Sequence, residues 1–334
     1  MRDYTEAARA FDHGQAAAAA LHGNLEALNA CVECCDRHAG EGKTALVWED
    51  REGNSVRLSF DQLQALAARF ANVLEAQGVG AGDRVAGLMP RTPELLVTIL
   101  ATWRLGAVYQ PLFTAFGPKA IEHRLEQSHA RVVVTDSHNR AKLDDVHACP
   151  TIITVNARNG ELDFQQCLDK AADKCEPVMR SGNDPFLLMF TSGTTGPAKP
   201  LEVPLRAIVA FQGYMRDAID LRPDDVFWNL ADPGWAYGLY YAVTGPLSLG
   251  CATTFFDGPF SVESTCRVID RHGITNLAGS PTAYRMLIGY DRIGDAWEAE
   301  TTDGEPRSYL RVRFDDPALP EPISAALFLD GDGA

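Results

Sequence analysis

The first clear pattern in the chain is an amphipathic helix that begins near residue 59. Ser59 and Gln62 fit a capping box, and Gly78 is placed to end the helix. Apolar residues recur at helical spacing between these points: Leu63, Leu66, Ala67, Phe70 and Leu74. This spacing predicts one face packed against a core.

Short apolar runs then alternate with further helices. Thr92 and Pro93 are the preferred residues for a helix start. The expected helices cover residues 92–106 and 119–128. The expected strands cover residues 84–89, 131–135 and 151–155. Because these strands are apolar throughout and are separated by helices, they predict a parallel sheet covered on both faces.

A polar stretch at residues 157–185 separates this part from a second set of apolar runs, and we interpret it as a helix and a connection to a second sheet. The strands expected after it cover residues 186–190, 226–230, 252–256 and 274–278. The helices expected there cover residues 208–219 and 261–272. The predicted fold class is α/β, with two mostly parallel sheets flanked by helices.

The sequence pattern changes from residue 289 onward, where the chain has scattered charged residues, four prolines and little hydrophobic periodicity. Two short strands, at 309–314 and 325–329, are expected there. Little periodicity and many prolines predict a poorly structured tail. The expected organisation is one domain over residues 1–288, with parts at about 20–175 and 180–288, followed by a tail over 289–334.

Composition excludes some classes of partner. With 334 residues and 46% hydrophobic content, the chain is long enough for about two domains. The formal net charge of −15 argues against binding to nucleic acid or anionic lipid, because both need clustered Lys and Arg. The first twenty residues contain no apolar stretch of signal-peptide or membrane-spanning length, so a cytoplasmic location without a membrane span is expected.

Eight cysteines are scattered along the chain, and in a protein of this size they are expected to be reduced thiols. One cluster, Cys31, Cys34, Cys35 and His38, has spacings that suit zinc ligands on one helical face. The alternative is a helix with small buried thiols. That alternative is preferred, since apolar residues from Leu25 onward recur at helical spacing and no second ligand pair follows.

The segment TSGTTGPAKP at residues 191–200 carries the clearest chemical signal. It follows an apolar strand and precedes a helix, and open α/β sheets bind ligands beyond the carboxyl ends of their strands. Gly193 and Gly196 permit tight turns and close approach of backbone N–H groups to an anion. The side chains that suit a triphosphate are Ser192, Thr194, Thr195 and Lys199.

The position of Lys199 distinguishes this loop from the Walker A pattern. That pattern requires Gly-Lys-Ser/Thr, whereas Pro197 and Ala198 separate Gly196 from Lys199 here. The alternative is a polar, Gly-rich surface turn. The density of hydroxyls, glycines and a lysine favours phosphate binding instead.

The sequence MFTSGTTGPAK resembles the phosphate-binding signature of the adenylate-forming (AMP-binding) superfamily, which includes acyl-CoA synthetases, luciferases and peptide-synthetase adenylation domains. Other stretches resemble the short- and medium-chain acyl-CoA synthetase branch, which includes acetyl-CoA synthetases. They are DRH at 36–38 and the blocks at 82–117, 231–250 and 275–287. The resemblance covers roughly residues 20–288.

The resemblance implies a fold, a reaction and roles for residues. The fold is the large amino-terminal domain of these enzymes, with two stacked, mostly parallel sheets. The reaction joins a short- or medium-chain carboxylic acid to CoA through an acyl-adenylate, with ATP and Mg²⁺. The residues implied to bind ATP are Thr191, Ser192, Gly193, Thr194, Thr195, Gly196 and Lys199, with Lys199 and Thr195 catalytic. Those implied to lie beside the acyl pocket and thiol tunnel are Trp235, Ala236, Tyr237 and Gly238. The loop implied to help wall the acyl and nucleotide site is formed by Gly279, Ser280 and Pro281.

The chain also departs from the family pattern. Ala198 stands where Pro is usual, and Pro200 stands where Gly is usual, which removes a backbone donor. After residue 288 we find no Tyr-Gly-X-Thr-Glu segment, no ribose-binding Asp and no small domain with a catalytic Lys. These departures predict a domain incomplete at its carboxyl end, lacking the small catalytic domain, with uncovered strands that favour self-association.

Two alternatives to an active acyl-CoA synthetase stay open. One is a nucleotide-binding remnant without turnover, because the absent groups orient and neutralise the reactants. The other is an adenylation domain that loads a carrier protein, against which the 231–250 block argues. The histidines, including His123 and His272, are interpreted as surface or structural residues.

Overall fold

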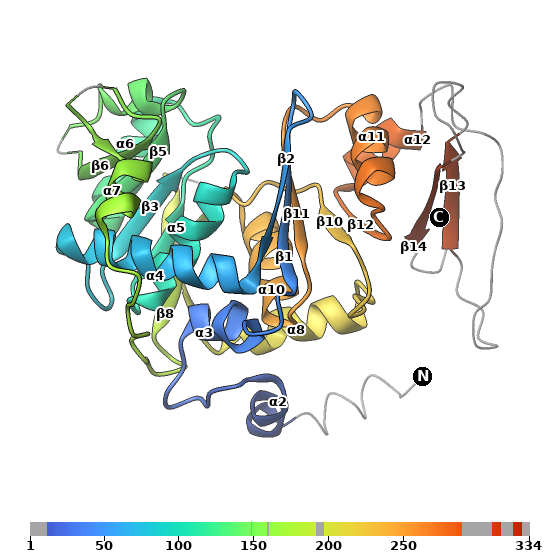
Figure 1. The fold of residues 1–334 in the computed structure, drawn as a ribbon, viewed down its shortest axis with the longest axis horizontal. Helices are drawn as coiled ribbons and strands as arrows, with labels where there is room; N and C mark the ends of the chain where they lie inside the picture. The colour runs from blue at the N-terminus through green and yellow to red at the C-terminus, as the bar shows by residue number, and fades with distance from the viewer. Residues whose placement is uncertain are drawn as a thin grey trace.

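The computed structural model describes residues 12–147, 149–158, 160–191, 197–288, 309–314 and 323–328. Two sheets stand side by side, with helices packed around and between them (Figure 1). Most strand pairs in both sheets are parallel, so the predicted α/β class is confirmed. No helix in this part of the chain combines the length and the apolar character needed to cross a membrane.

The first sheet has seven strands in the order β7-β6-β5-β3-β4-β8-β9. Their bounds are β3 Arg84–Leu88, β4 Val108–Pro111, β5 Val132–Asp136, β6 Thr151–Val155, β7 Leu162–Asp163, β8 Pro185–Thr191 and β9 Lys199–Pro204. All neighbours are parallel except β8 and β9, which form an antiparallel hairpin.

The second sheet has five strands in the order β12-β10-β11-β1-β2. Their bounds are β1 Thr44–Asp50, β2 Ser55–Ser59, β10 Phe227–Asn229, β11 Thr253–Asp257 and β12 Asn276–Ala278. Only β2 is antiparallel to its neighbour. A separate hairpin joins β13 (Tyr309–Phe314) to β14 (Ile323–Phe328), which lies beside β12 (Figure 1).

Helices cover both sheets and fill the space between them (Figure 1). Their bounds are α2 His13–Ala20, α3 Ala30–Cys34, α4 Phe60–Ala76, α5 Pro93–Arg104, α6 Pro118–Ser128, α7 Phe164–Lys170, α8 Ala207–Asp217, α9 Ala236–Gly238, α10 Gly245–Ser248, α11 Val262–His272 and α12 Pro281–Ile288. Short 3-10 turns are η1 (Asp36–His38) and η2 (Arg140–Leu143), and η3 (Leu239–Thr244) is π-helical.

Helix ends follow the local signals in the sequence. Ser59 caps α4, accepting the Gln62 N–H at 3.2 Å, while the Gln62 side chain accepts the Ser59 N–H at 2.9 Å. Thr92 caps α5 and Pro93 is its first residue. The two strands expected in the tail are present as β13 and β14. These predictions are confirmed.

Two predictions about the middle of the chain are wrong. The strand after residue 185 does not start a second sheet, because β8 pairs with β4 in the first sheet. The loop after β8 does not lead directly to a helix, because β9 lies between them. The apolar pattern identifies a strand but not its partner. The prolines at both ends of the β9 pairing, Pro200 and Pro204, fit its place at the edge of the sheet.

The hairpin β1–β2 belongs to the second sheet although it comes early in the chain. Strand β1 pairs with β11 in parallel, from Leu46 opposite Thr253 onward. Glu49 of β1 is fully buried, and its carboxylate contacts His272 Nε2 at 2.7 Å and Arg267 Nη2 at 3.0 Å. This ionic cluster joins α11 to β1, which are far apart in the sequence.

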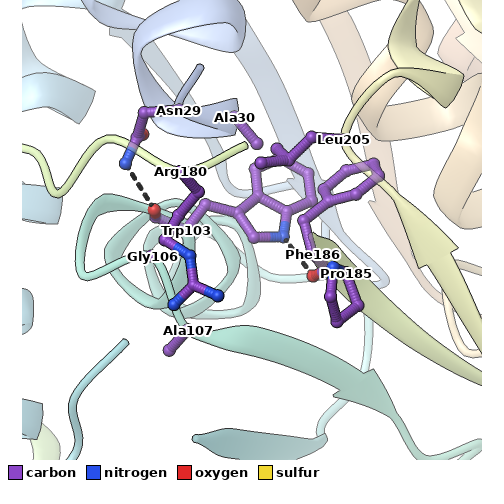
Figure 2. A pocket seen from close by; sticks show the side chains of 9 residues that line it. All are labelled: Asn29, Ala30, Trp103, Gly106, Ala107, Arg180, Pro185, Phe186 and Leu205. Carbon is purple, nitrogen blue, oxygen red and sulfur yellow. Dashed lines mark hydrogen bonds between the residues drawn. The ribbon is translucent and has the colours of Figure 1, made fainter. Parts of the chain in front are cut away.

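A buried contact around Trp103 joins α5 to the first sheet (Figure 2). The Trp103 indole N–H donates to the Phe186 carbonyl at 3.1 Å, and the Asn29 amide donates to the Trp103 carbonyl at 2.8 Å. The cavity beside them has a volume of about 10 Å³. That is room for about one water, so this space belongs to the core.

The predicted helix with buried thiols is present as the short α3, which contains Cys31 and Cys34 and has Cys35 as its C-cap, but it begins at Ala30 and does not include Leu25. Cys31, Cys34 and Cys35 are fully buried. The Cys34 thiol faces the Thr244 carbonyl at 3.7 Å, and the Cys35 thiol faces the Phe60 carbonyl at 3.5 Å. Burial raises the pKa of both thiols.

Candidate functional site

The β8–β9 hairpin positions the two ends of the Gly/Thr loop. Thr191 closes β8 and Lys199 opens β9, and the two residues are paired across the hairpin. The Thr191 hydroxyl donates to the Lys199 carbonyl at 3.5 Å, and both side chains are exposed. The loop residues expected to bind ATP lie outside the described residues: Ser192, Gly193, Thr194, Thr195 and Gly196.

Helix α6 lies against this hairpin through two consecutive residues. His123 Nε2 is 2.9 Å from the carbonyl oxygen of Ala198, directly before Lys199. The Arg124 guanidinium lies 4.1 Å from the Phe116 ring centroid and 5.5 Å from that of Phe190 in β8. Cation–π contacts of this kind stabilise partly desolvated arginines.

Trp235 belongs to the 231–250 block, which we call the aromatic block, and it packs near the start of α6. Its ring packs against Phe113 at 5.3 Å and against Phe116 at 5.5 Å between centroids. The side chain is nevertheless 44% exposed. Phe116 is therefore shared between Arg124 of α6 and Trp235.

Tyr237 belongs to a cluster of tyrosines beyond Trp235. Its ring meets Tyr241 at 5.1 Å and Tyr214 at 6.5 Å. Burial, followed by a hydrogen bond with Tyr214, raises the pKa of Tyr237, so its phenol is neutral at physiological pH. The cluster offers an uncharged and partly exposed surface.

The two glycines expected at the site allow close backbone packing. A Cβ on Gly238 would lie 2.1 Å from the Asp232 carbonyl oxygen, and one on Gly279 would lie 3.1 Å from the Leu230 side chain. Ala236 packs against the main core beside Gly238. Only a residue without a side chain fits at Gly238 without moving the backbone.

Gly279, Ser280 and Pro281 connect β12 to α12. Ser280 Oγ accepts the Ala283 N–H at 3.2 Å, and Pro281 is the first helical residue. Strands β12 and β10 are parallel neighbours. The predicted 279–281 and 235–238 segments therefore both follow the carboxyl ends of adjacent strands.

A cavity of about 490 Å³ opens between the two sheets at the carboxyl ends of their parallel strands. Open α/β sheets bind ligands at this edge. The lining residues are Arg51, Pro90, Arg91, Thr114, Ala115, Asp136, His138, Asn139, Lys142, Asp232, Asp257 and Gly258. The sequence did not predict this cavity, although some of its charged residues, such as Arg91 and Asp136, follow the apolar runs expected as strands at 84–89 and 131–135.

Arg91 and Asp257 show how charge is balanced in the cavity. Arg91 donates to the carbonyls of Leu230 and Gly258, each at 3.2 Å. Burial raises the pKa of Asp257, while the charges of Arg51 and Arg91 lower it. The cavity therefore mixes cations with a carboxylate that is costly to ionise.

The family model described as AMP-binding enzyme matches residues 34–324. The chain belongs to this family. The acetyl-coenzyme A synthetase of Sodalis glossinidius (strain morsitans) is 36% identical over 315 residues, covering 85% of this chain and 47% of the relative. That of Pseudoalteromonas translucida (strain TAC 125) is 33% identical over 290 residues, covering 78% and 45%.

A solved structure supports the same AMP-binding assignment. The crystal structure of Brucella canis acyl-CoA synthetase has a TM-score of 0.82 and 52% identity, covering 86% of this chain and 54% of that chain. The resemblance predicted from the loop and the four blocks is confirmed. The chain spans about half the length of the relatives it matches.

Proposed function

We propose that this chain provides the nucleotide- and acid-binding part of an AMP-forming acid–thiol ligase. The observation that carries the proposal is the β8–β9 hairpin. It connects to both ends of the signature loop of the AMP-binding family, and Lys199 is the first residue after the loop in β9. In the proposed reaction, a carboxylate attacks the α-phosphorus of ATP and releases pyrophosphate. The CoA thiol then attacks the acyl-adenylate and releases AMP.

Lys199 is suited to bind phosphate because its backbone and side chain have different environments. The β ladder fixes its backbone opposite Thr191, while its side chain is exposed and free to reach an anion. A positive group placed where charge develops lowers the barrier without reorganisation. Mg²⁺ would accompany the phosphates of ATP.

The aromatic block is suited to hold the acyl group of a short or medium acid. Trp235 and Tyr237 present uncharged, partly exposed rings. Gly238 allows its backbone to lie close to that of Asp232, and Gly279 leaves room for the Leu230 side chain. Apolar walls bind the acyl chain while leaving its carboxylate directed to the phosphates.

The cavity between the sheets is suited to bind the phosphorylated part of CoA. Arg51, Arg91 and Lys142 supply positive charge there, and Asp232 links the cavity to the aromatic block. Arginine and lysine are the usual partners of phosphate groups. The names of the relatives, acetyl- and acyl-CoA synthetases, favour CoA over a carrier protein as the acceptor.

The first test of the proposal is Mg·ATP binding measured by calorimetry. We expect Lys199→Ala to weaken binding by about 1–3 kcal/mol, the size of a charge-assisted hydrogen bond. Lys170→Ala, at an exposed position on α7, is the matched control and should bind like the wild type. Equal affinity in wild type and Lys199→Ala would remove Lys199 from the nucleotide site.

Exchange of labelled pyrophosphate into ATP distinguishes the ligase from its alternatives. Acid-dependent exchange demonstrates adenylation by this chain, and transfer to CoA rather than to a carrier protein then identifies the acceptor. Mg·ATP binding without exchange for any short or medium acid would support the remnant without turnover. Absence of Mg·ATP binding would contradict the proposed function.

A further inference from the structure

Two prolines reduce the number of backbone N–H groups at the Lys199 end of the phosphate loop. Pro197 and Pro200 flank it, and neither has an N–H group. The ladder of the hairpin begins at Lys199, so the preceding carbonyl of Ala198 lies outside it. A half-buried carbonyl in this position needs a partner from elsewhere in the fold.

His123 of α6 supplies that partner. Its Nε2 is 2.9 Å from the Ala198 oxygen, and the Phe190 ring lies edge-on at 6.4 Å. Because the carbonyl can only accept, Nε2 must carry the proton. Both the Nε2–H tautomer and the imidazolium do so, and the bond therefore survives a change in the charge of His123.

The neighbouring Arg124 continues the connection from the hairpin to the aromatic block. It contacts Phe190 on one side and Phe116 on the other, and Phe116 packs against Trp235. Helix α6 thus contacts the β8–β9 hairpin directly through His123 and Arg124, and it reaches Trp235 indirectly through Phe116. Because a helix is rigid, these contacts fix the distance between the hairpin and Trp235.

We propose that His123 is a positioning residue, which anchors the Lys199 end of the phosphate loop to α6. The inference rests on the proposed function, since it assumes that Lys199 meets the phosphates of ATP. By holding Ala198, His123 sets where Lys199 leaves the hairpin relative to Trp235. It touches the loop backbone and acts on ATP only through Lys199.

The test compares His123→Phe, which keeps an aromatic ring but has no donor, with His123→Gln, which keeps a donor at similar reach. His147→Phe, at an exposed histidine, is the control for introducing the phenyl ring. We expect His123→Phe to weaken Mg·ATP binding roughly three- to tenfold, the range of one net hydrogen bond, and His123→Gln to restore it. Melting temperatures should stay close to that of the wild type.

Hydrogen exchange provides a second measurement that does not need ATP. Peptides covering residues 185–204 should exchange faster in His123→Phe than in the wild type, with recovery in His123→Gln. Unchanged exchange in His123→Phe would overturn the inference. If the wild type fails to bind Mg·ATP, the proposed function is contradicted, and the exchange result alone decides whether His123 anchors the loop.

Discussion

His38 is held uncharged by its surroundings in the turn η1. Its ring lies 5.2 Å from that of Phe60, and a Cβ on Gly250 would lie 2.7 Å from His38 Nδ1. Burial, reinforced by the charge of Arg37, lowers the pKa of His38 from 6.5 to about 4. A protonated imidazole would therefore destabilise this part of the fold.

We predict a pH-dependent loss of stability that depends on His38. The unfolded chain takes up a proton as the pH falls through 6.5, whereas the folded protein does so only near about 4. The unfolded state holds more protons in this window, so the free energy of unfolding falls as the pH is lowered through it. Urea unfolding at about pH 7 and about pH 4.5 should show a smaller loss in His38→Gln than in the wild type.

Exposed His147 provides the control for this measurement, since His147→Gln should keep the wild-type pH dependence. If His38→Gln and the wild type lose the same free energy of unfolding between the two pH values, His38 is not the cause of the pH dependence.

Individual residues were recognisable in the sequence where their chemistry lies in the side chain. Lys199 and its loop could be predicted as a phosphate site because a cation, hydroxyls and glycines occur together. His123 was interpreted as a surface or structural residue, since its partner is the backbone carbonyl of Ala198, which any residue type provides. The cavity between the sheets was missed because it exists only once distant segments meet.

At the scale of elements, helix α9 depends on a residue without a side chain. A Cβ at Gly238 would lie 2.1 Å from the Asp232 oxygen and 2.3 Å from its carbonyl carbon, both backbone atoms. We predict that Gly238→Ala lowers the free energy of unfolding by about 1–3 kcal/mol, the usual cost of overpacking. Chemical denaturation measures this change.

Gly213 on helix α8 offers a matched control, because an added Cβ there would meet nothing within 4 Å. Gly213→Ala should raise the free energy of unfolding by about 0.5–1 kcal/mol through helix propensity. A Gly238→Ala variant that is also stabilised would show that α9 can move away from Asp232.

Elements were predicted well where their signals are local. Helices α4, α5 and α11 carry their own caps, and periodicity marks their buried faces. The partner of β8 and the presence of β9 were not predicted, because pairing depends on hydrogen bonds to distant strands. The hairpin β1–β2 was also missed, since its strand β2 is largely exposed.

At the scale of the whole molecule, Arg91 links the two sheets. It follows β3 of the first sheet and donates to the carbonyls of Leu230 and Gly258, which follow β10 and β11 of the second. The Trp48 indole N–H of β1 donates to the Arg91 carbonyl at 3.0 Å. These bonds join the loops that border the cavity.

We predict that Arg91→Ala reduces the cooperativity of unfolding. With the linking side chain removed, the two sheets should begin to unfold at different temperatures, and the van't Hoff enthalpy should fall below the calorimetric enthalpy. Differential scanning calorimetry measures both quantities. Arg57→Ala, on the exposed face of β2, is the control, and equal enthalpy ratios in the two variants would contradict a linking role for Arg91.

The pairing of β1 with β11 sets the order in which this protein can be assembled during synthesis. The two strands lie roughly 200 residues apart in the chain, so the second sheet gains its central pair late. Strand β1, with buried Ala45, Leu46 and Val47, therefore emerges from the ribosome long before its partner. A nascent chain in this state exposes an apolar strand edge, the kind of surface that chaperones protect until β11 arrives.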